Sequence, residues 1–463
     1  MEPSNASNSL RRLPGVDALL HTEPLRALAQ RYGLAEIKAA LRALQNEWRA
    51  TRTAPEWAQD PAAYAIALEK TLRGTGYRPV FNLTGTLLHT NLGRAPLPAA
   101  AFDATRDLVT RPMNLEFDLA SGERGERETP VTDRLKRLTG AEAATVVNNC
   151  AAALMLVLNT FALGRRVPVS RGELIEIGGS FRLPEIMTRS GCALHEVGAT
   201  NRTHLHDYAE AISAETGLLL KVYPSNYRIE GFASSPGVRE LAELAHARAL
   251  PFCVDIGSGA LLDLRRWGLP HEATPGEILA QGADLVICSG DKLLGAVQSG
   301  LILGRADLVE ACRRNPMKRA LRADKVTLAL LDYTLGLYED PARLEAELPL
   351  FRWLETAPAL LLERGERVLA ALGDRLAPEF RLQVEESRAE MGSGALPEAS
   401  LDSRAVVIDH DEDRALRGLQ DALRCCATPV IGRLHRGRLW LDLRGADPID
   451  ALVDALATLE TPT

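Results

Sequence analysis

Six short apolar runs between residues 143 and 304, separated by stretches with helical periodicity, constrain the fold of this chain most strongly. The runs are AATVV, ELIEI, LLLKVY, PFCVDI, DLVICS and SGLILG, which begin at positions 143, 173, 218, 251, 284 and 299. Strands that alternate with helices predict a mostly parallel sheet covered by helices on both faces. Because such proteins bind ligands at the carboxyl ends of their strands, we expect the functional residues to follow these runs.

The pattern changes on both sides of this region, which indicates further domains. Residues 24–50 carry apolar side chains at steps of three to five, as in two amphipathic helices broken near Gly33. A linker containing two glycines and a proline follows, and beyond about residue 340 the pattern is helix, irregular stretch, two strand-like runs and helix. We predict an N-terminal helical domain (1–78), a large α/β domain (79–338) and a small C-terminal α+β domain (339–463).

The composition argues against membrane, disulfide and metal-centred scaffolds. The sequence contains no run of eighteen apolar residues and does not open on a signal-peptide pattern, so we expect a cytoplasmic protein with no membrane partner. Its seven cysteines lack the CxxC or Cys/His spacing of metal sites, and their odd number fits reduced thiols.

The net charge gives no general sign of a nucleic-acid partner. The chain carries a formal charge of -7, whereas proteins that bind nucleic acids usually have a basic surface. Residues 1–80, however, contain 11 Lys and Arg against 8 Asp and Glu, so the helical module carries a net positive charge. Any RNA contact is therefore expected to be local, and none with DNA is expected.

Lys292 lies at the end of a predicted strand, a position suited to a reactive lysine. In ADLVICSGDKLLGAVQSGLILG it follows an apolar strand by three residues, in a turn flanked by Gly290 and Gly295. A lysine that forms a Schiff base must be partly desolvated, because the neutral amine is the nucleophile. A lone turn lysine is more often simply solvated, so this position needs support from its neighbours.

Asp255 supplies such support at the end of the neighbouring run, FCVDIGSGALLD. Pyridoxal-phosphate enzymes place a carboxylate at the pyridine nitrogen, which keeps the ring protonated and able to withdraw electrons. Taken alone, a strand-end aspartate is more often a turn cap. Beside Lys292, the cofactor role is the better interpretation.

The segment VVNNCAAALMLVL predicts a phosphate-binding helix start. It reads as a strand, two asparagines and then small residues that open an apolar helix, so Cys150, Ala151 and Ala152 are candidates for a backbone cradle. Turns of this kind are common in α/β folds, and the signal is weak on its own.

A second anion site is suggested by EACRRNPMKRALRADK. Lys318, Arg319 and Arg322 have the spacing of one helix face after Pro316, although a solvated basic face is the ordinary explanation. In HTNLGRAPLP, Arg94 lies in a loop bounded by glycine and proline, which alone decides nothing.

Together these segments resemble a known family, the bacterial selenocysteine synthases or L-seryl-tRNA(Sec) selenium transferases. The resemblance runs along the whole chain. It is carried by RRLPGVDALL, FNLTGTLLHTNLGRAPL, EFDLASGERGER, IEIGGSFRLPEIM, GATNRTHLHDY, CVDIGSGAL, SGDKLLG and MKRALRADK. It implies a fold-type I, aminotransferase-like enzyme that uses pyridoxal 5'-phosphate to exchange the hydroxyl of seryl-tRNA(Sec) for selenium from selenophosphate.

The resemblance also implies roles for individual residues. Lys292 would be the cofactor lysine, Asp255 the partner of the pyridine nitrogen and Asp291 a neighbour of the active centre. The anionic selenium donor would be bound by Arg94, Arg319 and Arg322. The helical N-terminal domain would bind the tRNA, and the chain would assemble as a homodecamer, a pentamer of dimers.

Two positions depart from the family pattern as we know it. Ala199 stands where threonine is more usual, and Cys150 stands where asparagine is expected, which puts side-chain contacts to the cofactor phosphate in question. Phe181 is the candidate for stacking on the cofactor ring. The candidates for tRNA contact are the basic residues of the N-terminal module: Arg11, Arg12, Arg31, Lys38, Arg42 and Arg49.

Three other functions are compatible with the same residues. A lyase or transaminase acting on a small free amino acid would use Lys292 and Asp255 in the same way, but would have no evident use for residues 1–80. A catalytically silent tRNA-binding protein would not need Lys292. The third alternative is sulfur or selenium transfer through the thiol of Cys150 or Cys288. Cys288, however, lies inside an apolar strand, where a buried structural thiol is typical.

Overall fold

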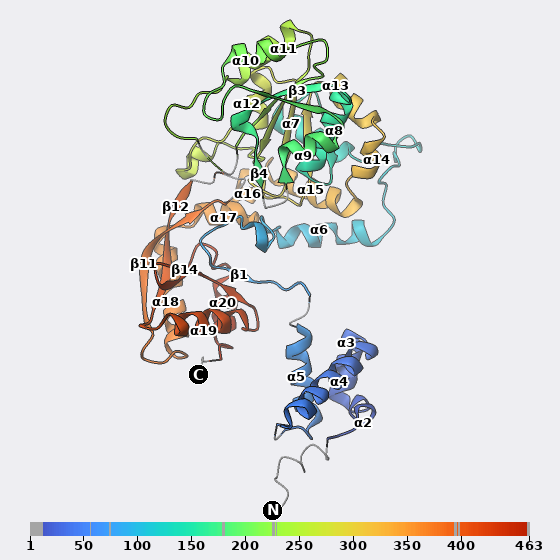
Figure 1. The fold of residues 1–463 in the computed structure, drawn as a ribbon. Coiled ribbons are helices and arrows are strands. Elements are labelled where there is room, and N and C mark those ends of the chain that lie inside the picture. Colours follow the sequence, from blue (N-terminus) through green and yellow to red (C-terminus); the bar gives the residue numbers. More distant parts are fainter. Residues whose placement is uncertain are drawn as a thin grey trace, which may run out of the picture. The chain divides into compact units, whose positions relative to one another are not determined.

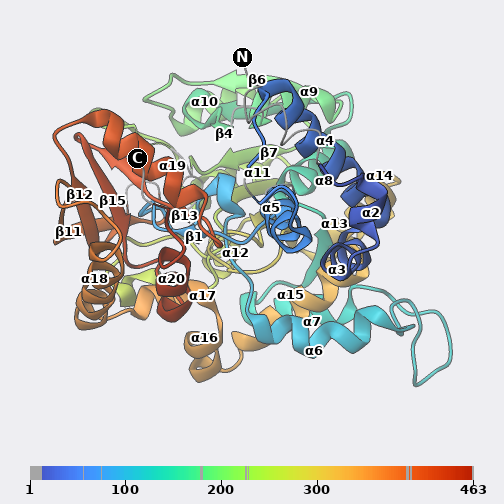
Figure 2. The same ribbon diagram turned by 90° about the horizontal axis from the view of Figure 1, so that it is seen from below.

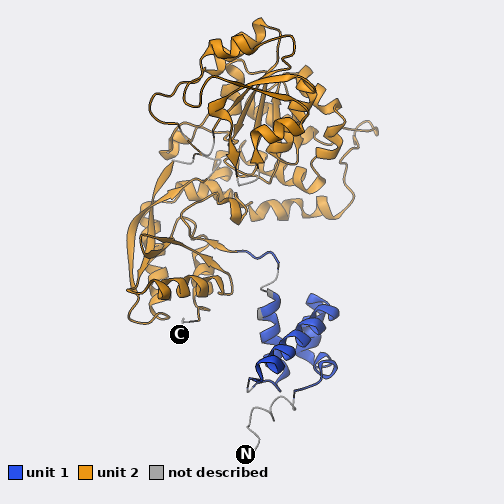
Figure 3. Ribbon diagram, in the orientation of Figure 1, with its two compact units in different colours: residues 1–79 blue, residues 80–463 orange. Residues whose placement is uncertain are grey.

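The computed structural model describes residues 13–55, 57–73, 76–177, 181–224, 227, 229–392, 396 and 399–460. The chain forms two compact units, residues 1–79 and residues 80–463 (Figure 3). The division lies one residue beyond the predicted end of the N-terminal domain. The boundary predicted after residue 338 falls within the second unit and stays a prediction.

The N-terminal unit is a small helical bundle. Its helices are α2 (Val16–Leu20), α3 (Glu23–Tyr32), α4 (Leu34–Thr51) and α5 (Pro61–Arg73). The break predicted near Gly33 is confirmed: this residue, at φ 95°, ends α3 and precedes α4. The apolar stripes meet in one core in which Trp48 packs against Trp57 and Tyr64, with ring centroids 5.2 and 5.5 Å away.

The second unit is built around a five-stranded sheet with the order β2-β10-β9-β8-β7. The strands are β2 (Ala143–Val147), β7 (Leu219–Val222), β8 (Phe252–Gly257), β9 (Leu285–Ser289) and β10 (Gly300–Gly304). β7, β8 and β9 are parallel, whereas β10 runs antiparallel to both of its neighbours. Five of the six predicted runs are thus confirmed as strands of one sheet.

The prediction of a strand over the sixth run, 173–177, was largely wrong, and a further pair of parallel strands was not predicted. Residues 171–173 form a short 3-10 helix, and only Glu176–Ile177 (β4) pairs, with Phe181–Arg182 (β5). β3 (Arg166–Ser170) and β6 (Ala193–Val197) form a separate parallel pair. Their sequences, RVPVS and ALHEV, mix charged and polar residues with apolar ones, so they lack the continuous apolar character of the other strands.

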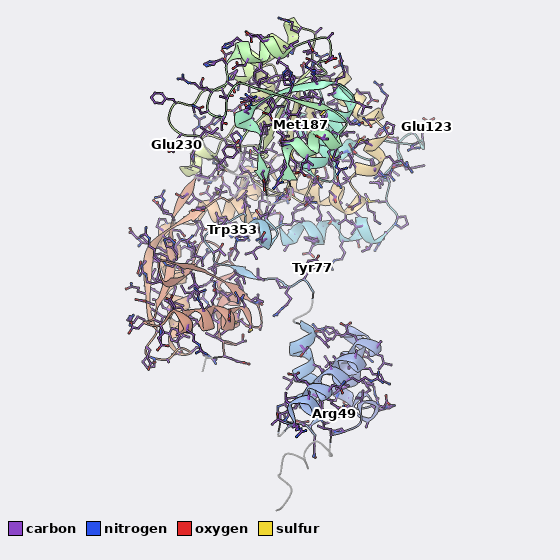
Figure 4. The ribbon with its side chains drawn as sticks, in the orientation of Figure 1. Arg49, Tyr77, Glu123, Met187, Glu230 and Trp353 are labelled. Atoms are coloured by element: carbon purple, nitrogen blue, oxygen red, sulfur yellow. The ribbon has the colours of Figure 1, made fainter. Side chains whose placement is uncertain are left out.

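Helices cover both faces of the five-stranded sheet (Figure 1). Side chains along β9 alternate between two cores: Val286 and Cys288 belong to one, Leu285 and Ile287 to the other. The helices on the first face are α7 (Thr129–Thr139), α10 (Leu205–Ala211), α11 (Val238–Ala247), α12 (Pro275–Ala280) and α15 (Lys325–Leu337). Those on the second face are α8 (Cys150–Ala162), α9 (Leu183–Arg189) and α13 (Ala306–Arg314). Met187 of α9, labelled in Figure 4, is fully buried in this second core.

The C-terminal part forms its own layer at one side of this unit (Figure 2). Its four-stranded antiparallel sheet has the order β11-β12-β15-β14, with α18, α19 and α20 packed around a separate core. The strands are β11 (Arg381–Glu390), β12 (Ser400–Asp409), β14 (Arg433–His435) and β15 (Arg438–Asp442), and the helices Pro358–Gly373, Asp413–Arg424 and Ile449–Leu456. The ten-residue β11 falls in the stretch predicted to be irregular.

The remaining elements connect these layers. They are β1 (Phe81–Asn82), which pairs with β13 (Val430–Ile431), and helices α6 (Ala99–Thr110), α14 (Met317–Leu321), α16 (Pro341–Glu347) and α17 (Pro349–Glu355), with 3-10 turns at Thr90–Leu92 and Leu264–Trp267. No helix in the described part of the chain is both long and apolar enough to cross a membrane. All seven cysteines are free, as predicted.

Candidate active site

Lys292 lies in a tightly bonded turn between β9 and β10. The amide of Gly290 donates to the Ser299 carbonyl (2.9 Å), and the amide of Gly295 donates to the carbonyl of Lys292 itself (2.9 Å). At Gly290 a β-carbon would lie 2.8 Å from the backbone carbonyl oxygen of Val297, so a side chain at this position would force the turn to shift. Lys292 is 7% exposed, which excludes the solvated-turn interpretation.

Asp255 is held next to this turn by the close approach of two strand ends. A β-carbon on Gly259, at φ 74°, would lie 2.1 Å from the Ser289 carbonyl oxygen. The amide of Leu293 donates to the Ser258 carbonyl (2.9 Å), which ties the loop after β8 to the Lys292 turn. The glycine-rich sequence after Asp255 therefore brings the carboxylate and the amine together.

The environment of Asp255 is unusual for a carboxylate. The side chain is buried, and burial raises its pKa to about 6, although the charge of Lys292 acts in the opposite direction. It accepts hydrogen bonds from the Gly257 amide (3.0 Å) and, more weakly, from the Cys150 thiol (3.7 Å). A buried carboxylate with so few donors is ready to pair with a cationic group on a ligand.

The start of α8 faces the same space, but not all of it can bind an anion. The Asn149 side chain caps the helix by accepting from the amide of Ala152 (2.8 Å). That amide is therefore engaged, and the prediction that Ala152 belongs to the phosphate cradle is not supported. Cys150 and Ala151, at the first two positions of α8, do line the space.

Arg94 is brought to the site by a contact across 197 positions of sequence. Its guanidinium donates to Asp291 Oδ2 (2.7 Å), and Ser289 Oγ donates to Asp291 Oδ1 (2.5 Å). Arg94 itself has φ 61°, a left-handed conformation that costs a non-glycine residue about 1–3 kcal/mol. Asp291 is buried and is bonded to the Arg94 guanidinium, whereas Arg94 lines the site.

These groups enclose a hollow of about 370 Å³. Lys292, Asp255, Cys150, Ala151, Arg94 and Phe181 all line it, so the structure brings together six of the residues singled out in the sequence. Further lining residues were not predicted: Thr90, Asn149, Ile175, Ile177, Val222, Tyr223, Gly257, Ser289 and Gln298. Tyr223 could have been found, because it directly follows the strand β7.

Comparison with known proteins identifies the family. The family of L-seryl-tRNA selenium transferases matches residues 80–447, and a family described as selenocysteine synthase N terminal matches residues 10–49. The chain belongs to the L-seryl-tRNA selenium transferase family. It is 47% identical over 453 residues to the L-seryl-tRNA(Sec) selenium transferase of Yersinia enterocolitica, covering 96% of this chain and 98% of that protein. The corresponding protein of Methylocella silvestris is 48% identical over 461 residues, covering 98% of each.

The fold agrees with this assignment. The structure of D-glucosaminate-6-phosphate ammonia-lyase superposes with a TM-score of 0.60 over 83% of this chain and 95% of that one, at 21% identity. The predicted fold class is confirmed: this chain has fold type I of the pyridoxal-phosphate enzymes, with a mostly parallel sheet and a helical N-terminus.

Arg319 and Arg322 lie outside the Lys292 hollow. They line a separate hollow of about 310 Å³ together with Glu116 and Arg127. The predicted shared helix face is wrong, because α14 ends at Leu321 and Arg322 is already extended. Arg322 forms a long ion pair with Glu116, at 3.6 Å.

Lys318 has a structural role instead of an anion-binding one. Its Nζ donates to Glu128 Oε1 (2.5 Å) and to the Val146 carbonyl; Glu128 is buried, and the Lys318 side chain is 12% exposed. The other oxygen of Glu128 accepts from Thr145 Oγ1 (2.7 Å) and from the Val146 amide (3.0 Å). This network fastens α14 to β2, directly before the start of α8.

The cysteines are poorly suited to carry sulfur or selenium. Burial raises the pKa of the Cys150 thiol, and the nearby charge of Asp255 raises it further. Burial likewise raises the pKa of Cys288, whose side chain is fully enclosed in a core. Since the thiolate is the nucleophile, neither thiol is activated.

Proposed function

We propose that this chain converts L-seryl-tRNA(Sec) to L-selenocysteinyl-tRNA(Sec), with pyridoxal 5'-phosphate as cofactor and selenophosphate as selenium donor. The observation that carries the proposal is the convergence of a buried lysine, a buried carboxylate and an oriented arginine on one hollow: Lys292, Asp255 and Arg94. The names of the relatives, L-seryl-tRNA(Sec) selenium transferase, support the choice of substrate.

The residues of the hollow fit the cofactor. Lys292 would hold it covalently through the amine, and Asp255 would pair with the pyridine nitrogen. The Asp255 carboxylate, with a pKa of about 6 in its present surroundings, would be stabilised in its charged form by a pyridinium partner. The amides at the start of α8 would bind the phosphate, and Phe181 is the candidate for stacking on the ring.

The bound cofactor supplies an electron sink for the negative charge that develops on the serine α-carbon. Lys292 Nζ is the base for the α-proton, since its turn places it inside the hollow. Asp291 holds the Arg94 guanidinium toward the hollow, where it can bind an anionic selenium donor. An aminoacyl ester has no free carboxylate, so Arg94 is not needed to bind the amino acid.

The donor roles of Arg319 and Arg322 need a separate test, since these residues line another hollow in the chain. We expect Arg94→Ala to raise the selenophosphate concentration at half-maximal rate at least tenfold. Arg319→Ala and Arg322→Ala should do the same if they contact the donor in the assembled enzyme. Unchanged dependence on selenophosphate in both variants would remove them from the site.

The N-terminal unit would bind the tRNA. Arg11 and Arg12 lie outside the described residues. Arg31 and Lys38 are engaged in ion pairs with Glu69 and Asp17, at 2.8 and 2.6 Å, and Arg49 donates to Asn46 and Gln45. Arg42 is exposed and is the best placed candidate for a phosphate contact.

A chain of residues 80–463 should retain the cofactor and lose affinity for tRNA(Sec); retained affinity would refute this role. Homodecamer assembly and a cytoplasmic location belong to the same proposal.

The decisive experiment compares the wild type with Lys292→Ala in a selenium-transfer assay. Each protein is incubated with seryl-tRNA(Sec) and selenophosphate while its visible spectrum is recorded, and Lys136→Ala, which changes a half-exposed lysine of α7, serves as control. We expect the wild type and the control to be yellow and active, and Lys292→Ala to lose both properties. A yellow wild type that ignores seryl-tRNA(Sec) and turns over a free amino acid would overturn the function and retain the fold.

A further inference from the structure

A second hollow, of about 510 Å³, adjoins the Lys292 hollow. The two share Val222 and Tyr223, at the end of β7. Other parts of its wall come from the segment after β6 (200–203), the loop 229–235 and Ala399, which directly precedes the C-terminal strand β12. Glu230 of that loop, labelled in Figure 4, lies on the side of the large domain where β12 reaches it. None of the residues proposed above to bind the cofactor or the selenium donor lines this second hollow.

The charges in this second hollow do not favour an anion. Lys221 lines it, but its Nζ donates to Glu173 Oε1 (2.8 Å) and to Ser235 Oγ (3.0 Å). Both members of the Lys221–Glu173 pair are buried, so the positive charge is already compensated. Glu272 adds a further carboxylate to the wall. The lining therefore suits a neutral, hydroxyl-rich ligand.

The same walls offer the contacts that a ribonucleoside requires. A carboxylate such as Glu272 can accept hydrogen bonds from ribose hydroxyls, as acidic residues do in nucleotide-binding folds. Tyr223 and Tyr227 provide aromatic surface for a base, and the Tyr227 ring is fixed because its hydroxyl donates to the Gly172 carbonyl (2.5 Å). Thr200 and Ser234 add hydroxyl groups along the wall. A volume of 510 Å³ is within the range of small-ligand pockets.

The position of the hollow fits the geometry of an aminoacyl ester. Serine attached to tRNA must reach Lys292 while its ester oxygen remains bonded to the terminal ribose. The nucleoside must therefore lie directly beside the Lys292 hollow, as this second hollow does. Burial raises the pKa of the Glu272 carboxyl, and the charge of Lys292 lowers it by a smaller amount. Glu272 is therefore close enough to Lys292 to interact with its charge. We propose that the second hollow is the subsite for the 3'-terminal adenosine of seryl-tRNA, an inference that rests on the proposed function.

The test uses the full chain loaded with cofactor and two small probes, of which the ester is freshly prepared. One is 3'-L-serylamido-3'-deoxyadenosine, in which an amide replaces the labile ester, and the other is L-serine methyl ester. Binding is followed by titrating the change in cofactor absorption. We expect the adenosine probe to bind at least about tenfold more tightly than the methyl ester, as stacking of one base can provide.

Two variants and one control locate the effect. Ala233→Trp places an indole in the wall of the second hollow from an exposed loop position, and Glu272→Gln removes the carboxylate with little change of shape. Both should reduce the advantage of the adenosine probe over the methyl ester by fivefold or more. Ala214→Trp, at an exposed position that does not line the hollow, should leave that advantage unchanged.

The outcomes separate this inference from the proposed function. Equal affinities of the two probes in the wild type, or an advantage that survives in both Ala233→Trp and Glu272→Gln, would overturn the nucleoside subsite and leave the proposed function intact. If neither probe changes the cofactor spectrum, the proposed function fails and the subsite fails with it.

Discussion

Asp255→Asn should stabilise the cofactor-free protein while weakening its affinity for the cofactor. Burial raises the pKa of the Asp255 carboxyl from 3.8 to about 6, so the folded chain holds an ionised carboxylate at neutral pH at a cost in free energy. The shift of about two units, at about 1.4 kcal/mol each, corresponds to about 3 kcal/mol. An amide of nearly the same shape carries no charge and avoids this cost, but it cannot form an ion pair with a pyridinium.

The pH dependence follows from the sign of this shift. The pKa in the folded state lies above that in the unfolded state, so the folded chain binds the proton more tightly. The free energy of unfolding therefore falls as the pH rises from about 4 to about 6, and the loss is complete above that range. The difference between Asp255→Asn and the wild type should be close to zero below about pH 4 and should reach about 3 kcal/mol at pH 7.5.

Scanning calorimetry of the cofactor-free proteins at equal concentration would measure this difference. We expect the melting temperature of Asp255→Asn to exceed that of the wild type by a few degrees at pH 7.5 and by less at pH 5. Asp284→Asn is the matched control, because Asp284 is equally buried but accepts from Arg305 (3.0 Å) and the Phe252 amide (2.9 Å). It should melt lower at both pH values. An Asp255→Asn protein that is less stable than the wild type at pH 7.5 would refute the reasoning.

Two further predictions concern groups that packing holds in place. Lys318→Met should destabilise the fold by about 3–5 kcal/mol, since it leaves Glu128 buried without its counter-ion, whereas the exposed Arg319→Met should change stability by less than about 0.5 kcal/mol. Thermal melts would measure both, and equal effects would contradict the structural role of Lys318. Gly300→Ala should weaken cofactor binding, because its β-carbon would lie 2.0 Å from the Asn149 carbonyl oxygen and displace the start of α8. Cofactor titration would detect this, and unchanged affinity would show that the helix start does not bind the cofactor phosphate.

Local sequence was a good guide to the central sheet and to the residues at its strand ends. The runs that became β7, β8 and β9 are mostly apolar, with only Lys221 and Asp255 charged, because both faces of the sheet are buried, and this pattern can be recognised without a structure. It fails for β3 and β6, whose polar residues gave no such signal. It also fails for 173–177, where Glu173 turns inward to pair with Lys221 and the chain forms a 3-10 turn.

The candidate site, like the fold, was predicted from the sequence only in part. The positions of Lys292 and Asp255 after apolar strands were enough to suggest cofactor chemistry, and the structure places both in one hollow. Sequence spacing could not reveal that the Ala152 amide is used by the Asn149 cap, nor that α14 is too short to include Arg322. Both depend on where a helix begins or ends, which capping and packing decide within one or two residues.

The sequence by itself determined the α/β alternation, the helical N-terminal module, the family and the chemical identity of the reactive groups. Those properties depend on residue type and on spacing within about a dozen positions. Only the tertiary structure decided which charges are internal and which face a ligand. Lys318 is neutralised by Glu128 and Arg94 is held by Asp291, whereas among the described residues no cationic side chain is bonded to Asp255. The physical reason is that the energy of a charge depends on burial and on partners that lie nearly 200 residues away in sequence, and folding alone brings these together.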